Sequence, residues 1–196
     1  MKALLLSLLL VASAVVVSGC AVEVGSSPAE LAAARHVSDD PPYVSVVTMV
    51  NNGSGRAAHS ALIINGSERV IYDPAGTFQH QELAERGDIH YGATDRMVSY
   101  YMRYHARFSH FVHEQRLYVS PAVAEATLRR AQLQGPSPKM MCNFHTTDIL
   151  NDVGAFGTLN ASIFPEKLRQ QFATIPGVQD HYTREDADRA KAVPNS

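Results

Sequence analysis

The chain has 196 residues, 45% of them hydrophobic and 18% charged, and its formal net charge is -2 at pH 7. That length is enough for one domain with a sizeable hydrophobic core. The small net charge gives no electrostatic basis for a nucleic-acid partner, and the composition excludes a collagen-like, disulfide-rich or largely disordered chain.

The N-terminal segment has the features of a secretory signal peptide. One basic residue, Lys2, precedes an apolar run over residues 4–17, which is shorter than the roughly 20 residues that cross a bilayer. We therefore expect residues 1–19 to be removed on export. The sequence VSGC at residues 17–20 resembles the lipobox of bacterial lipoproteins, which implies that Cys20 becomes the lipidated N-terminus; the alternative is an ordinary signal peptide.

Lipidation of Cys20 would also determine location and partner. The resemblance implies an exported protein that is anchored in the bacterial envelope through its lipid, with the membrane as its partner. Ala21, rather than aspartate, follows the cysteine. By the sorting rule of that class, this indicates the outer membrane, facing the periplasm, if the source is Gram-negative. Residues 20–42 are predicted to form the lipidated N-terminus and a flexible tether, with a short helix over residues 28–35.

Alternation and β-branched residues predict the start of a sheet after the tether. The expected strands cover residues 43–50, 58–64 and 68–73. A loop at 51–55 follows the first strand, and a turn at 65–67 joins the other two as a hairpin. Residues 79–86 are predicted to form a helical turn.

The rest of the chain is mainly helical in pattern, because apolar residues recur at spacings of three and four. We expect one further strand over residues 110–119. The expected helices cover residues 94–108, Pro121–Gln134, 141–153 and Pro165–Phe172. Residues 181–196 are polar and are expected to be disordered. The sequence thus predicts a single α+β domain over residues 43–180, with a small antiparallel sheet packed against helices.

The second cysteine, Cys142, is the candidate nucleophile. With Cys20 lipidated, the chain contains no other cysteine for a disulfide in an oxidising compartment. Cys142 lies in the first turn of a predicted helix, where free N–H groups and the helix dipole stabilise a thiolate. Simple burial of a structural cysteine is the alternative explanation.

Of the nine histidines, His59 is the candidate general base, because a rigid strand can hold its ring in a fixed direction. Asp73 on the neighbouring strand could orient that ring. A three-residue loop at 65–67 would place Asp73 opposite His59, whereas a two-residue loop would turn it to the other face. Gln79 and His80, just past the turn, are alternative orienting groups.

Two sequence blocks carry a resemblance to a known fold: HSALIINGSERVIYDPAG at residues 59–76 and MCNFHTTDIL at residues 141–150. Their content and order are similar to the circularly permuted papain-like fold of permuted NlpC/P60 amidases and of LRAT-like and PPPDE-like thiol hydrolases. In these proteins a strand hairpin carries the base and a later helix carries the nucleophile. The resemblance implies Cys142 as nucleophile and His59 as base, and it implies no metal or other cofactor.

The residues and the resemblance together predict a cysteine hydrolase. The Cys142 thiolate would attack an amide or ester carbonyl, His59 would transfer the proton, and the N–H of Cys142 would contribute to an oxyanion hole. The expected substrates are peptidoglycan peptides or lipid acyl groups.

Two other functions compete with the hydrolase. A catalytically inactive papain-like lipoprotein could act as a binding or scaffold module in the envelope. A metal site could also form from His105, His110 and His113, but their spacing matches no common ligand motif.

Overall fold

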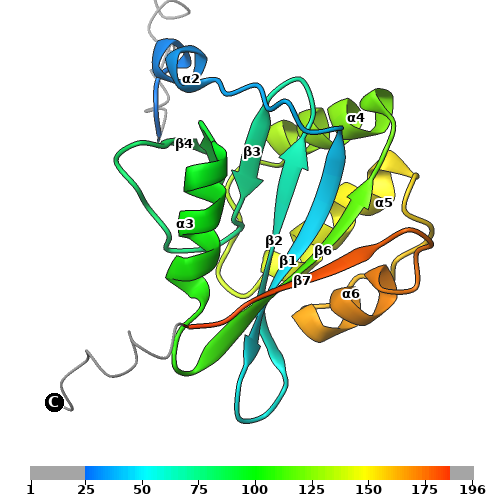
Figure 1. The fold of residues 1–196 in the computed structure, drawn as a ribbon. Coiled ribbons are helices and arrows are strands. Elements are labelled where there is room, and N and C mark those ends of the chain that lie inside the picture. Colours follow the sequence, from blue (N-terminus) through cyan, green and yellow to red (C-terminus); the bar gives the residue numbers. More distant parts are fainter. Residues whose placement is uncertain (1–24, 186–196) are drawn as a thin grey trace, which may run out of the picture.

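The computed structural model describes residues 25–185, which form an α+β fold with an antiparallel sheet of seven strands and, within these residues, five helices (Figure 1). The α+β class and the antiparallel sheet expected from the sequence are confirmed. The strand order across the sheet is β4-β5-β3-β2-β1-β6-β7. The strands are β1 (Tyr43–Asn51), β2 (Ala57–Asn65), β3 (Arg69–Tyr72), β4 (Ala84–Arg86), β5 (Ile89–Tyr91), β6 (His110–Tyr118) and β7 (Gln179–Thr183). The helices are α2 (Pro28–Ala34), α3 (Asp95–His105), α4 (Pro121–Gln134), α5 (Cys142–Val153) and α6 (Pro165–Phe172).

Helices cover both faces of the sheet. In Figure 1, α3 lies on one face and α4, α5 and α6 lie on the other. The core is accordingly divided in two: Val46 and Leu62 belong to the cluster with α4–α6, while Val47 and Ile63 belong to the cluster with α3. Alternate residues of the central strands therefore point into different cores, which explains why β1 is buried at nearly every position.

Local chemistry determines where α4 and α5 begin and where α5 ends. The Ser120 hydroxyl accepts the Val123 N–H at the start of α4, and Pro121 occupies the first turn. In contrast, α5 begins at Cys142 with no side-chain cap, and it ends at Gly154, whose φ of 72° suits glycine. The uncapped start leaves backbone N–H groups beside Cys142.

Three expectations about secondary structure are wrong. Residues 79–86 contain a turn followed by β4, not a helical turn, and β4 and β5 are three-residue strands too short to show alternation. The helix expected over residues 94–108 ends at His105, and Phe108 beyond it is 85% exposed. Residues 179–183, most of them in the expected tail, form β7 along β6. These residues are polar, so backbone pairing rather than an apolar pattern defines this edge strand.

The predicted tether is held against the domain over its described part, which corrects the expectation of a flexible segment. The backbone N–H of Ser26 donates to Glu85 O at 2.7 Å, beside a bridge between Gly25 and Arg86. The short helix α2 forms as expected, with a capping box in which Ser27 and Glu30 bond reciprocally.

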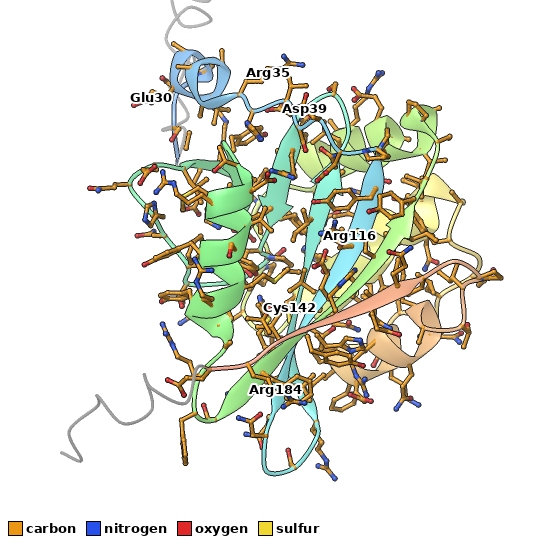
Figure 2. All side chains as sticks on the ribbon, viewed as in Figure 1. Glu30, Arg35, Asp39, Arg116, Cys142 and Arg184 are labelled. Atoms are coloured by element: carbon orange, nitrogen blue, oxygen red, sulfur yellow. The ribbon has the colours of Figure 1, made fainter. Side chains whose placement is uncertain are left out.

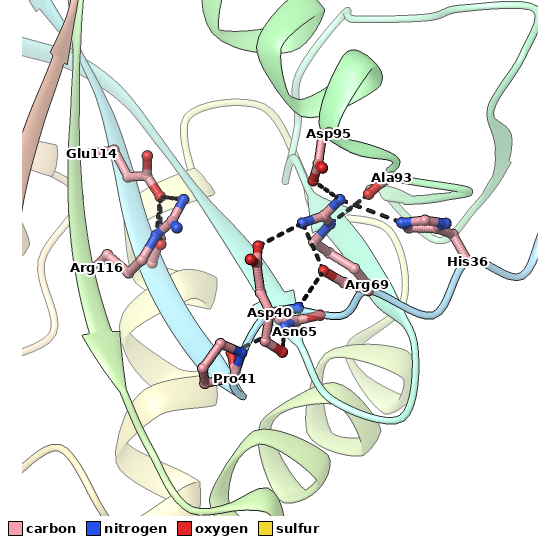
Figure 3. Close-up of polar contacts among 11 residues, drawn as sticks. His36, Asp40, Pro41, Asn65, Arg69, Ala93, Asp95, Glu114 and Arg116 are labelled. Atoms are coloured by element: carbon pink, nitrogen blue, oxygen red, sulfur yellow. Dashed lines mark hydrogen bonds and ion pairs between the residues drawn. The ribbon is translucent and has the colours of Figure 1, made fainter.

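Arg69 holds the next part of this segment (Figure 3). Its side chain is 2% exposed, so every guanidinium N–H requires an acceptor. The Nη1 group bonds to Ser38 Oγ at 3.1 Å and to Asp40 Oδ2 at 3.2 Å, and Nε donates to Ala93 O at 2.6 Å. The Nη2 group pairs with Asp95 at the start of α3. Residues 36–40 are therefore part of the folded domain.

Residues 1–24 and 186–196 lie outside the described part of the chain, and with them the expected signal peptide, Cys20 and the end of the expected tail. Among residues 25–185, no helix combines the length and the apolar character needed to span a bilayer.

Candidate active site

The candidate nucleophile lies where the hairpin of β2 and β3 opens. The two strands pair only from Leu62 to Asn65 along β2, because β3 ends at Tyr72 and a proline follows Asp73. Cys142, at the start of α5, lies near the centre of the molecule (Figure 2). The backbone N–H of Ser60, just beyond the part of β2 that pairs with β3, lies close enough to the Cys142 sulfur to lower the pKa of the thiol.

The register of the hairpin places Asp73 and His59 on the same face of the sheet. The loop has three residues, but they are 66–68 rather than the expected 65–67, because Asn65 pairs with Arg69. Continued past Tyr72, this register puts Asp73 opposite Ala61 and diagonal to His59, a spacing that polar side chains can bridge. The His59 Nε2 lies 2.6 Å from Asp73 Oδ1.

Neither alternative orienting group contacts the His59 ring. Gln79 is exposed, and the His80 ring packs against Tyr100, with 4.7 Å between the ring centroids. Among the expected orienting groups, Asp73 is thus the one that the structure brings to His59.

Asp73 is held more firmly than sequence reasoning indicated. Its side chain is only 1% exposed, and its Oδ1 also accepts the Tyr101 hydroxyl at 2.9 Å. Tyr101 fits the apolar pattern of α3, and nothing in that pattern separates it from an ordinary core residue. The hydroxyl fixes the carboxylate from the side opposite to the sheet hairpin and thereby fixes the orientation of His59.

Gly76 permits this arrangement because a side chain there would overlap the Asp73 carboxylate. We expect Gly76→Ala to displace Asp73 and to destabilise the fold by about 1–3 kcal/mol. The displaced carboxylate would also leave His59, so the thiol of Cys142 should react more slowly with iodoacetamide at neutral pH. Thermal unfolding and the alkylation rate measure the two effects.

Gly53→Ala is the matched control, because an added Cβ there would make only an ordinary contact with Asn51 in the exposed hairpin loop. Equal thermal stability and equal alkylation rates in the two variants would contradict the packing role of Gly76.

The three side chains shift one another's pKa values. Burial alone would lower the pKa of His59, but hydrogen bonds to Asp73 and Cys142 and their negative charges raise it to about 10. Burial alone would raise the pKa of the Cys142 thiol, but the hydrogen bond and charge of His59, with the backbone N–H groups of Ser60 and Asn143, lower it. The same pairing outweighs burial at Asp73 and lowers its pKa. These shifts favour a thiolate–imidazolium pair with a carboxylate behind it.

The start of α5 supplies backbone donors next to the sulfur. The first backbone hydrogen bond of the helix runs from His145 N–H to Met141 O at 3.0 Å, so the N–H groups of residues 142–144 precede it. Asn143 fixes this end of the helix: its Oδ1 accepts the Ser60 hydroxyl at 3.3 Å, and its Nδ2 donates to Ser162 O at 2.6 Å. The sequence gives no local signal for these two contacts.

The three histidines considered as a metal site do not come together. His113 bonds to Asp180 at 2.7 Å and stacks on Tyr182 between β6 and β7, whereas His105 and His110 line a pocket beside His59. In residues 25–185, no group of three His, Cys, Asp or Glu side chains is placed to share a metal ion.

The structure therefore brings Cys142, His59 and Asp73 together at an uncapped helix start. Cys142 is 7% exposed and forms no disulfide, and 20% of the His59 side chain is accessible. The arrangement contains a nucleophile, a proton carrier and an orienting carboxylate. Comparisons of the chain with models of protein families, with curated proteins and with solved structures found no match.

Proposed function

We propose that the protein is a cysteine hydrolase that cleaves an amide or ester bond through an acyl-enzyme. The observation that carries this proposal is the 2.6 Å contact between Asp73 and His59 beside a thiol whose pKa is lowered by that histidine. A histidine that stabilises a thiolate at the start of a helix is the arrangement that nucleophilic catalysis by cysteine requires.

The geometry supports a two-step reaction. The Cys142 thiolate attacks the substrate carbonyl, and the backbone N–H groups at the start of α5 stabilise the negative oxygen that forms. The His59 imidazolium then gives its proton to the leaving amine or alcohol, and a thioester remains on Cys142. Water attacks the thioester while His59 accepts a proton from it. The departing acid frees the thiolate and restores the ion pair.

The order of the elements supports the permuted papain-like type. The base lies on a strand of an early hairpin, and the nucleophile lies at the start of a later helix. The base and the nucleophile follow the same order in permuted NlpC/P60, LRAT-like and PPPDE-like hydrolases. The two sequence blocks at residues 59–76 and 141–150 resemble those proteins in the same order.

We further propose that the protein is exported and anchored by a lipid on Cys20. Support comes from the signal-like residues 1–19 and the lipobox-like sequence before Cys20. Because Gly25 is already held beside Arg86, the five residue-to-residue steps from Cys20 to Gly25 would keep the domain within about 18 Å of its anchor. The accessible substrates would then be peptides of the cell wall or acyl groups of envelope lipids.

The pH dependence of Cys142 alkylation tests the proposed ion pair. We expect the rate with iodoacetamide to level off below pH 8.5, where an ordinary thiol titrates, because His59 stabilises the thiolate and lowers the pKa of Cys142. His59→Gln should move the inflection upward. His80→Gln, which removes a ring that does not contact the site, should leave it in place.

An inflection at or above pH 8.5 in the unmodified protein would contradict the hydrolase. That result would instead favour the inactive binding or scaffold module, in which Cys142 is only a buried residue.

A further inference from the structure

A pocket of about 400 Å³ opens beside the proposed catalytic pair. Its lining includes His59, Gly76, Tyr104, Arg107 and His110. The pocket therefore adjoins the ring that exchanges the proton. Any group of the substrate that occupied it would lie beside the His59 ring.

Among residues 25–185, no carboxylate pairs with the positive charge in this pocket. The Arg107 guanidinium lies over the Tyr104 ring, 4.8 Å from its centroid, and forms no ion pair with any described residue. The described residues that line the pocket include no Asp or Glu. The carboxylate of Asp73, which contacts His59, is already bonded to that ring and to Tyr101.

A larger pocket elsewhere in the described structure differs, because its inward arginines are paired with carboxylates. It encloses about 910 Å³ between α3 and the strands β1, β6 and β7, and its lining includes the buried Arg69 and the partly buried Arg116 (Figure 3). Each is already paired, Arg69 with Asp40 and Asp95 and Arg116 with Glu114. Those guanidinium groups serve the fold, whereas Arg107 is exposed and presents a planar set of donors to a pocket whose described lining carries no carboxylate.

We propose that the substrate carries an anionic group, a carboxylate or a phosphate, which Arg107 binds in the pocket beside His59. This inference rests on the proposed hydrolase function and adds the chemical class of the substrate. A guanidinium binds either anion through two parallel hydrogen bonds, so it would position the substrate as well as attract it. A carboxylate would come from a peptide and a phosphate from a lipid headgroup.

Matched esters test the proposal in the full chain. Three 4-nitrophenyl esters of similar length would be compared: a glutarate half-ester, a phosphonobutyrate and the neutral valerate. We expect the anionic ester that fits the pocket to be preferred. In Arg107→Gln the ratio of its kcat/KM to that of the valerate should fall about tenfold. The anionic ester whose ratio falls more in Arg107→Gln identifies whether the anionic group of the substrate is a carboxylate or a phosphate.

Arg103→Gln is the matched control, because Arg103 is an exposed arginine of α3 that lines the larger pocket instead. The ratio should remain at the wild-type value there. A similar fall in both variants, or an unchanged ratio in Arg107→Gln, would overturn the proposal.

A binding measurement separates the pocket from the chemistry. Glutarate and methylphosphonate would be titrated into Cys142→Ala while NMR follows the ring signals of His59 and His110. Shifts that disappear with Arg107→Gln would support the anion site. If no ester were hydrolysed in the same protein, the proposed hydrolase function alone would be contradicted. Ester hydrolysis without such shifts would leave the hydrolase standing and overturn the anion site.

Discussion

Replacing Cys142 by alanine should abolish hydrolysis while leaving the fold intact. We expect kcat to fall by about 10⁴-fold or more, because no other group in the site can form the acyl-enzyme. The free energy of unfolding should change by no more than about 1 kcal/mol, because only one sulfur atom is lost from a side chain at the edge of the core. Ester or amide turnover and thermal unfolding measure the two quantities.

Cys142→Ser is the corresponding conservative variant. It keeps the size of the side chain and a hydrogen-bond donor, but its hydroxyl ionises far less readily than a thiol. We therefore expect it to be as inactive as the alanine variant. A destabilised Cys142→Ala protein that still hydrolysed the substrate would contradict the catalytic role and support a purely structural one.

Local sequence signals predicted the elements that present the site. The Gly-Pro-Ser-Pro run at residues 135–138 separates two helices, so the start of α5 at Cys142 could be placed to within one residue. Likewise, Ser120 and Pro121 gave the start of α4. Both signals depend on a few neighbouring residues and need no knowledge of the tertiary structure.

Contacts between distant segments could not be predicted in this way. Tyr101 reaches Asp73 across 28 positions of sequence, and Ser60 reaches Asn143 across 83. Neither pair has a local pattern, because the packing of α3 and α5 on opposite faces of the sheet creates both. The same holds for β7 and for residues 36–40, whose polar sequences resemble those of free chain ends but bond to β6 and to Arg69.

The hairpin shows how a register error can leave a functional inference unchanged. The observed three-residue loop covers residues 66–68, one position later than the three-residue alternative considered from the sequence. Both registers place His59 and Asp73 on the same face, because side chains alternate with a period of two. The inference that Asp73 orients His59 therefore depended on whether the number of residues in the loop is odd or even, and not on where the loop begins.

The charge of Asp73 should determine the pH range over which the enzyme works. Asp73→Asn keeps an oxygen that can accept from His59 and from Tyr101, so the ring should stay in place. It removes the negative charge that helps to raise the pKa of His59 to about 10. We expect kcat/KM to fall by about 10²- to 10⁴-fold at neutral pH, because fewer molecules hold the thiolate–imidazolium pair.

The shape of the pH profile follows from the direction of each pKa shift. In the wild-type protein the alkaline limb should lie near pH 10, where His59 loses the proton that the leaving group needs. In Asp73→Asn this limb should move to lower pH. The acid limb should move to higher pH, because a histidine that is less often charged lowers the pKa of Cys142 less. The active range thus narrows from both sides. Asp180→Asn is the matched control, since it removes the charge from a His–Asp contact of similar length, 2.7 Å to His113, away from the site. An Asp73→Asn profile as wide as that of Asp180→Asn would show that the carboxylate does not hold the charge of His59, and with it the role of Asp73 in the site would fail.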